Sequence, residues 1–196
     1  MADLVESRDH FTGGHIERTQ GGLRILIEAL RDLGLYQDII ADWDMDQILR
    51  ASQLHDVGKI AIRDSILLKP GRLTPEEFEE MKKHTTYGVD IISKVEKNIA
   101  ESPFLTHAKI FAATHHEKWD GTGYPKGLRG EETPLQGRLM AIADVYDALS
   151  SYRPYKEPMS HDDSMKIILD GRGTHFDPIL VDLFAETESQ FRKLGD

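Results

Sequence analysis

Apolar residues recur at spacings of three and four along most of this chain, a pattern that is typical of amphipathic helices. In the N-terminal part it predicts one helix over residues 3–34, with a bend near the glycines at positions 13, 14, 21 and 22, because glycine is unfavourable inside a helix. A second helix is predicted from Trp43 to near Asp56. No segment alternates between apolar and polar residues as a half-buried strand would.

Capping residues mark the starts of later helices. Thr74, Pro75 and Glu77 have the spacing of a capping box with proline at the first helical position, and they predict a helix to about Lys83. Further helices are predicted through residues 89–95, over 103–116, over 134–150, over 160–170 after a Ser160 cap, and from Pro178 onward after an Asp177 cap. Residues 120–134, rich in glycine and containing two prolines, are predicted to form an ordered loop. We therefore expect residues 1–196 to form a single domain with an all-α helical bundle.

Composition and charge narrow the function classes. The 196 residues include no cysteine, which excludes disulfide scaffolds, zinc ribbons and cysteine nucleophiles. The net charge of −10 argues against nucleic acid as a partner, because nonspecific affinity for nucleic acid depends on clustered Lys and Arg. No apolar run approaches the ~20 residues of a membrane-spanning helix, and the first ten residues lack the apolar core of a signal peptide. We expect a cytoplasmic protein without membrane insertion.

Histidines and aspartates on or beside the predicted helices offer metal-site chemistry. The candidates from five elements are His15, His55, Asp56, His84, His115, His116 and Asp144. In a bundle such side chains can converge on the core, where coordination or hydrogen bonding offsets the cost of burial. Spacing alone leaves a metal site and ordinary hydrogen-bonded side chains about equally favoured. Imidazole and carboxylate ligands without thiolates suit iron or manganese.

Four motifs and their order resemble the HD-GYP family, a branch of the HD phosphohydrolase superfamily that hydrolyses cyclic di-GMP. They are LHDVGKI (54–60), HTTYG (84–88), HHEKWDGTGYPKGL (115–128) and AIADVYDALSSYRPY (141–155), extended by GGHIERT (13–19) and GTHFDP (173–178). The resemblance implies an HD-superfamily helical bundle with the metal site in its core. It also implies two divalent metal ions, for which we favour iron, with manganese as the alternative.

The resemblance assigns a role to each candidate ligand. His15, His55, Asp56 and Asp144 would hold one ion, and Asp56, His84, His115 and His116 the other. Asp56 would then bridge the two ions, which is natural for a carboxylate because each oxygen can serve one ion. Two metals can polarise a phosphate and turn a bridging water into hydroxide. Asp56 is therefore predicted to be catalytic as well as a ligand.

Basic residues beside these motifs are candidates for binding substrate phosphates. Lys59 lies about one helical turn beyond His55 and is predicted to act in catalysis and phosphate binding. Arg153 and Lys156 match positions with which family members grip the ligand's phosphates. Asp147 shares a helix face with Asp144, so it could assist the leaving oxygen or bind metal, although a surface aspartate is nearly as well favoured.

Tyr124 lies in the GYP loop, which sets this family apart from other HD hydrolases. The loop could shape the substrate pocket, dock diguanylate cyclase (GGDEF) domains, or only pack the fold. The remaining histidines lack motif support and are predicted to be ordinary residues: His10, His107, His161 and His175.

Three functions stay open at this point. The first is a phosphodiesterase that opens cyclic di-GMP to linear pGpG, with GMP as a further product. The second is a non-catalytic module that binds the nucleotide or a cyclase, and the third is an enzyme for a mixed cyclic GMP-AMP dinucleotide. Because receiver or sensor domains commonly precede this domain in the family, we expect the output domain of a longer signalling protein.

One position departs from the family pattern. Some relatives carry glutamate four residues before the histidine of the first motif and use it to help hold a third metal, whereas Phe11 stands there in this chain. A phenyl ring cannot coordinate metal. The sequence therefore predicts a dinuclear site.

Overall fold

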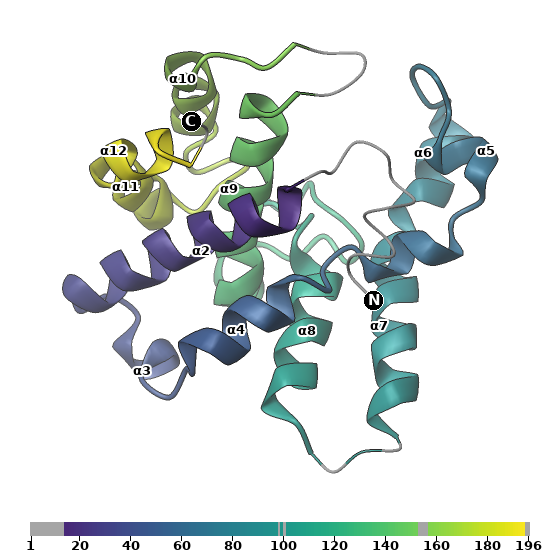
Figure 1. Ribbon diagram of the computed structural model, residues 1–196, viewed down its shortest axis with the longest axis horizontal. Coiled ribbons are helices and arrows are strands. Elements are labelled where there is room, and N and C mark those ends of the chain that lie inside the picture. Colours follow the sequence, from purple (N-terminus) through teal and green to yellow (C-terminus); the bar gives the residue numbers. More distant parts are fainter. Residues whose placement is uncertain (1–13, 98, 100, 153–156, 195–196) are drawn as a thin grey trace.

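The computed structural model describes residues 14–97, 99, 101–152 and 157–194, and these form a helical bundle without strands (Figure 1). The helices are α2 (His15–Asp32), α3 (Gln37–Ile40), α4 (Met45–Ser52), α5 (Asp64–Leu67), α6 (Pro75–Lys82), α7 (His84–Glu96), α8 (Pro103–Thr114), α9 (Leu135–Ser150), α10 (His161–Asp170), α11 (Pro178–Glu186) and α12 (Glu188–Arg192), with the 3₁₀ helices η1 (Val57–Ala61) and η2 (Gly130–Glu132). The predicted all-α class is confirmed. None of the described helices is both long and apolar enough to cross a bilayer.

Helix α9 forms the centre of the bundle. It packs against α2, α8, α10 and α11, and most of its side chains are buried, including Leu139, Met140 and Ile142. Helices α7 and α8 lie side by side as a pair, and α4 covers the other side of α8 (Figure 1). This arrangement brings the starts of α2 and α7 and the ends of α4 and α8 toward one face of α9.

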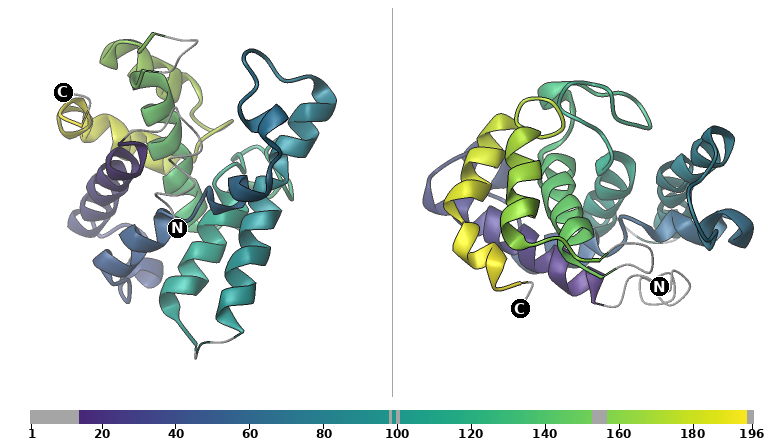
Figure 2. Two further views of the ribbon diagram at one scale, coloured as in Figure 1. Left: turned by 45° about the vertical axis from the view of Figure 1, so that its right-hand side comes forward. Right: turned by 90° about the horizontal axis from the view of Figure 1, so that it is seen from above.

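A hairpin of α5 and α6 stands to one side of the bundle (Figure 2). It has its own small apolar cluster of Ile62, Ile66 and Leu67, separate from the main core. An ion pair between Lys69 Nζ and Glu77 Oε2, 2.5 Å apart, links the loop after α5 to α6. The hairpin connects the end of η1 to the start of α7.

The predicted caps are present. Thr74 and Glu77 form the reciprocal capping box of α6, and the Ser160 hydroxyl and the Asp177 carboxylate accept backbone hydrogen bonds at the starts of α10 and α11. The described part of the predicted 3–34 helix begins at His15 and ends at Asp32, with Gly14 and Gly34 in left-handed conformations at either end. The predicted part before Gly14 lies outside the described residues.

The predicted helix from Trp43 to Asp56 is too long at both ends. The Asp44 carboxylate accepts from Gln47 N and starts α4 at Met45, and α4 ends at Ser52, so His55 and Asp56 lie in a turn before η1. The pattern also missed α3, α5, α12, η1 and η2. These helices have three to five residues and show too little of the 3.6-residue period to be recognised.

Candidate metal centre

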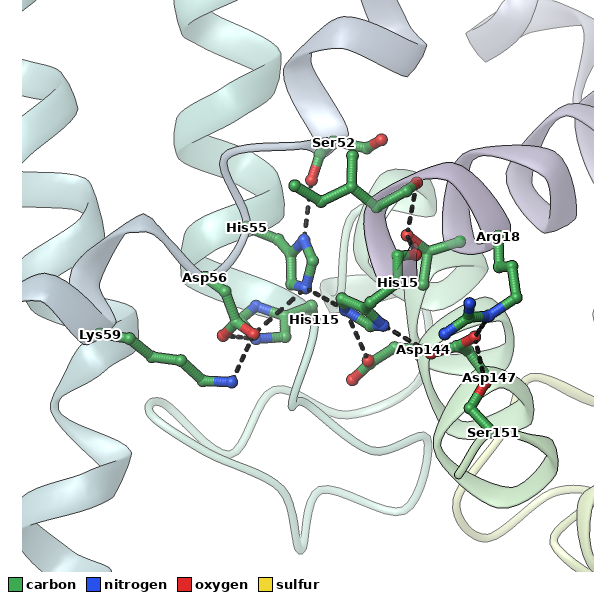
Figure 3. A network of polar contacts seen from close by, with 12 residues as sticks. His15, Arg18, Ser52, His55, Asp56, Lys59, His115, Asp144, Asp147 and Ser151 are labelled. Atoms are coloured by element: carbon green, nitrogen blue, oxygen red, sulfur yellow. Dashed lines mark hydrogen bonds and ion pairs between the residues drawn. The ribbon is translucent and has the colours of Figure 1, made fainter. Parts of the chain in front are cut away.

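All seven predicted ligands lie in two neighbouring groups, and Figure 3 shows His15, His55, Asp56, His115 and Asp144 together. His15 and His84 are the first residues of α2 and α7, whereas His115 and His116 directly follow α8. The remaining ligand candidates are His55 and Asp56 in the turn after α4 and Asp144 within α9. Side chains from the ends of several helices thus reach one region, although they are far apart in the sequence.

The seven side chains form two groups. In each group, one ligand atom per residue lies within 4.8 Å of the others: Asp56, His84, His115 and His116 in the first group, and His15, His55 and Asp144 in the second. The family resemblance implies the same division, except that it assigns Asp56 to both groups, whereas Asp56 falls in the first group here.

Asp56 directs one carboxylate oxygen toward each group. Its Oδ1 lies 3.3 Å from His84 Nε2 and 3.7 Å from His115 Nε2, whereas its Oδ2 lies 3.4 Å from His55 Nε2. The Oδ1 atom is buried and has no hydrogen bond of standard geometry among the described residues. A carboxylate in this position could bridge two cations.

Backbone carbonyls fix the orientation of three imidazoles. Because a carbonyl can only accept, each ring must carry a hydrogen on Nδ1, and in its neutral form it leaves Nε2 as a bare acceptor facing the site. The pairs are His55 Nδ1 with Ser52 O at 2.8 Å, His84 Nδ1 with Met81 O at 2.8 Å, and His115 Nδ1 with Phe111 O at 2.9 Å.

The resulting arrangement favours a bound cation. The Nε2 atoms of His84 and His115 are 3.3 Å apart, so two lone pairs would face each other unless a proton or a metal ion lies between them. Burial opposes the proton, because it lowers the pKa of His84 to about 4 and the pKa of His116 well below its usual range. With the buried Asp56 Oδ1, these nitrogens fit a divalent metal ion.

The charge of Asp56 is maintained by its neighbours. Burial would raise the pKa of Asp56, but the Lys59 ammonium and the His55 ring hold this pKa well below its usual range. Lys59 Nζ lies 2.7 Å from Asp56 Oδ2. Lys59 therefore lies beside the site, as predicted, and η1 brings it there because its 3₁₀ turn places residues three apart on one side. Arg153 and Lys156 lie outside the described residues.

Asp147 does not lie at the surface of its helix, which was one of its two predicted placements. It is buried, so it is not a surface aspartate, and both of its oxygens already accept hydrogen bonds. Oδ2 lies 2.6 Å from His15 Nδ1, and Oδ1 accepts from Arg18 Nε and from Ser151 Oγ, the latter at 2.8 Å (Figure 3). Its predicted role as a metal ligand or at the leaving oxygen stays a prediction. Asp147 lies behind His15, and its hydrogen bond to His15 Nδ1 orients His15 Nε2 toward His55 and Asp144.

The pKa values at this contact shift in the directions of a charged pair. Burial would lower the pKa of His15, but the hydrogen bond to Asp147 and the charges of Asp144 and Asp147 raise it. Burial would likewise raise the pKa of Asp147, but hydrogen bonds from His15 and Arg18 lower it. Arg18 was missed by the sequence reasoning, although it lies three residues after His15 and thus near it on the helix surface.

The GYP loop lies against the first group. The Tyr124 ring is 4.7 Å from the His116 ring, and burial raises the pKa of Tyr124. Gly123 allows the loop to approach closely, because a Cβ atom there would lie 2.3 Å from Lys118 N. Tyr124 therefore lies beside the predicted ligands, whereas its predicted substrate contact stays a prediction.

Glu117 holds this loop and was also missed by the sequence reasoning. Its carboxylate is buried and accepts from Lys126 N at 2.8 Å and Leu128 N at 3.0 Å. An acidic residue three positions before a glycine-rich loop, whose amides need acceptors, was the available signal.

The three other described histidines belong to neither group. They pair instead as follows: His107 with Gln136 Nε2 at 3.1 Å, His161 with the Tyr146 hydroxyl at 2.7 Å, and His175 by stacking on Phe176 at 4.1 Å. His10 lies outside the described residues.

Comparison with known proteins identifies the family. Residues 1–180 match the family described as HD domain. The chain therefore belongs to the HD domain family. An HD domain implies binding of divalent metal, in agreement with the two groups of His and Asp side chains.

Two relatives from Vibrio cholerae indicate to which branch of the HD family this chain is similar. A protein named cyclic di-GMP phosphodiesterase is 49% identical over 97% of the chain, and one named 3'3'-cGAMP-specific phosphodiesterase 2 is 42% identical over 97%. The chain spans 39% and 34% of their respective lengths. With the GYP loop, these matches confirm the resemblance to the HD-GYP branch.

A solved structure supports the fold. The crystal structure of a Vibrio cholerae phosphodiesterase described as specific for cyclic GMP-AMP has a TM-score of 0.60, with 18% sequence identity. The match covers 97% of this chain and 49% of the other. The two chains share the HD fold, and at this identity the likeness extends no further.

Proposed function

We propose that this HD domain is a metal-dependent phosphodiesterase that hydrolyses cyclic di-GMP to linear pGpG. The observation that carries the proposal is Asp56, which directs one oxygen to each of two ligand groups in a buried site. The relative named cyclic di-GMP phosphodiesterase supports the substrate. A non-catalytic binding module has less support, because it has no need for two complete ligand groups.

The chain's own residues would divide the work as the sequence predicts. His15, His55 and Asp144 would hold one ion and His84, His115 and His116 the other, with Asp56 shared. When bound, two divalent ions, preferably iron, supply Lewis-acid polarisation of the phosphodiester and activation of water. Lys59 Nζ would neutralise phosphate charge beside Asp56. Tyr124 would border the substrate on the side of His116.

The test is hydrolysis of a panel of cyclic dinucleotides by protein loaded separately with iron and manganese, with metal content measured on the same samples. We expect turnover of cyclic di-GMP, with faster turnover in the iron form. Asp56→Asn should lose most bound metal and nearly all turnover, whereas Asp170→Asn, at an exposed position on α10, should retain both. Full metal occupancy and unchanged turnover in Asp56→Asn would remove the two-metal mechanism.

A mixed cyclic GMP-AMP dinucleotide is the second candidate substrate, because the relative named for 3'3'-cGAMP is 42% identical. The same panel distinguishes it by the ratio of kcat/KM for the two dinucleotides. Docking of GGDEF domains on the GYP loop, an upstream receiver or sensor domain, and cytoplasmic localisation stay predictions.

A further inference from the structure

Helix α6 directs an exposed aromatic side chain toward the GYP loop. Phe78 is 46% exposed and is part of neither apolar cluster within the described residues. Its ring meets the Tyr124 ring edge-on, with centroids 6.1 Å apart and planes at 83°. Single exposed apolar residues are common, but this one continues a row of rings that begins at the metal centre.

The rings of His116, Tyr124 and Phe78 lie in a row that runs from the first ligand group to the surface. His116 and Tyr124 are 4.7 Å apart between ring centroids, and Tyr124 and Phe78 are 6.1 Å apart. Lys82 Nζ lies 5.5 Å from the Phe78 centroid and 5.7 Å from the Tyr124 centroid, and so places a positive charge at the rim. Its ion pair with Glu79 is at the surface, where such pairs contribute little.

We propose that Phe78 and Tyr124, with Lys82 at the rim, form a stacking platform for one purine base of the substrate. This inference rests on the proposed function, because a phosphodiester at the ligand groups would place its attached nucleoside beside them. A partly exposed aromatic ring next to the ligand groups offers a base an apolar surface, and the Lys82 ammonium over the two rings suits a ligand that carries phosphates. The platform adds α6 to the substrate-binding elements.

Stacking of this kind has a specific consequence. Every base has a π-face, so an aromatic platform binds adenine and guanine without distinguishing their hydrogen-bonding edges. Loss of Phe78 should therefore weaken cyclic di-GMP and 3'3'-cGAMP by similar factors. Inorganic phosphate, which has no base, should be unaffected.

The experiment compares Phe78→Ala, Phe78→Trp and wild type. Ile179→Ala on α11 is the matched control, because Ile179 is 44% exposed and helix α11 lies on the far side of the bundle from α6 (Figure 1). The measurements are KM for both dinucleotides on metal-loaded protein, Kd for cyclic di-GMP on chelator-treated protein, and Ki for inorganic phosphate. We expect about a tenfold rise in KM and Kd for Phe78→Ala. Phe78→Trp and Ile179→Ala should stay near wild type, and Ki should not change in any variant.

The outcomes separate this inference from the proposed function. If wild type hydrolyses or binds cyclic di-GMP and Phe78→Ala changes neither KM nor Kd, the platform is refuted while the proposed function stands. An equal rise in phosphate Ki would also refute it, because the effect would then lie in the metal centre. If wild type neither hydrolyses nor binds any cyclic dinucleotide, both fail.

Discussion

The Nδ1 hydrogen of His15 is held by a carboxylate, whereas His55, His84 and His115 use backbone carbonyls. A carbonyl acceptor survives any side-chain substitution, but the acceptor of His15 can be removed. Arg18 and Ser151 hold Asp147 in turn, so the orientation of His15 depends on a small buried network. Such partners orient a metal ligand and raise its basicity.

We therefore predict that Asp147→Asn weakens metal binding at the second group, that of His15, His55 and Asp144. The amide removes the negative charge that supports His15 and leaves Arg18 without its carboxylate. The affinity for the more weakly bound of the two metal ions should fall about 10- to 100-fold. A loss of this size is typical when a residue that hydrogen-bonds to a metal ligand is changed. Competition with a chelator of known affinity measures it, and Asp170→Asn is the control. If both ions bind with wild-type affinity in Asp147→Asn, Asp147 does not position His15.

At the scale of single elements, the turn after α4 decides how the HD dipeptide acts. Successive residues of an α-helix point about 100° apart, so a helix through His55 and Asp56 would separate their side chains. Because α4 ends at Ser52, both side chains instead reach the site, with His55 Nε2 and Asp56 Oδ2 3.4 Å apart. The helical pattern over Trp43–Asp56 could not reveal this, because it reports which residues are apolar and not where a helix stops.

Helix η1 approaches α7 closely at Gly58, and this contact gives a second prediction. A Cβ atom at Gly58 would lie 1.8 Å from His84 O and 2.5 Å from Gly88 N, so backbone must move. Gly58→Ala should destabilise the fold by about 3 kcal/mol or more and displace His84 from Asp56. Thermal unfolding and metal content measure the two effects.

Gly88→Ala is the control for this prediction, because it adds the same methyl group to the same interface. Its Cβ would lie 3.2 Å from the Ala112 Cβ, which requires only a small adjustment. We expect a smaller loss of stability and near-normal metal content. If both variants lost the same stability and the same amount of metal, the close contact between η1 and α7 would not be what positions His84 at the site.

Over the whole molecule, the sequence predicted the helices with clear caps and long apolar patterns, such as α6 and α9, to within about two residues. It could not place the site by spacing, because His15 and Asp144 meet only through the packing of α2 on α9. The division of the seven predicted ligands into two groups came from the family resemblance. Neither source indicated that Phe78 on α6 would reach the GYP loop, since this depends on how the α5–α6 hairpin stands beside the bundle.

The number of metal ions per chain is the last prediction. The described ligand groups suffice for two ions, and Phe11, at the position where the family resemblance places a third-metal glutamate in some members, lies outside the described residues. A third set of candidate side chains, His161, Asp162 and Glu188, lies elsewhere, on α10 and α12. Its two carboxylates already pair with Arg192, at 2.7 and 3.1 Å, so a cation there would have to displace a guanidinium.

We therefore expect two ions per chain, both at the Asp56 centre, by anomalous scattering at the metal edge. His161→Ala should leave this number unchanged, because it removes the imidazole of the third set without touching the centre. A fall from three to two in His161→Ala would instead place an ion between α10 and α12. Three well-occupied ions at the Asp56 centre of the wild-type protein would contradict the dinuclear prediction, since another oxygen or nitrogen ligand would then have to replace the missing glutamate.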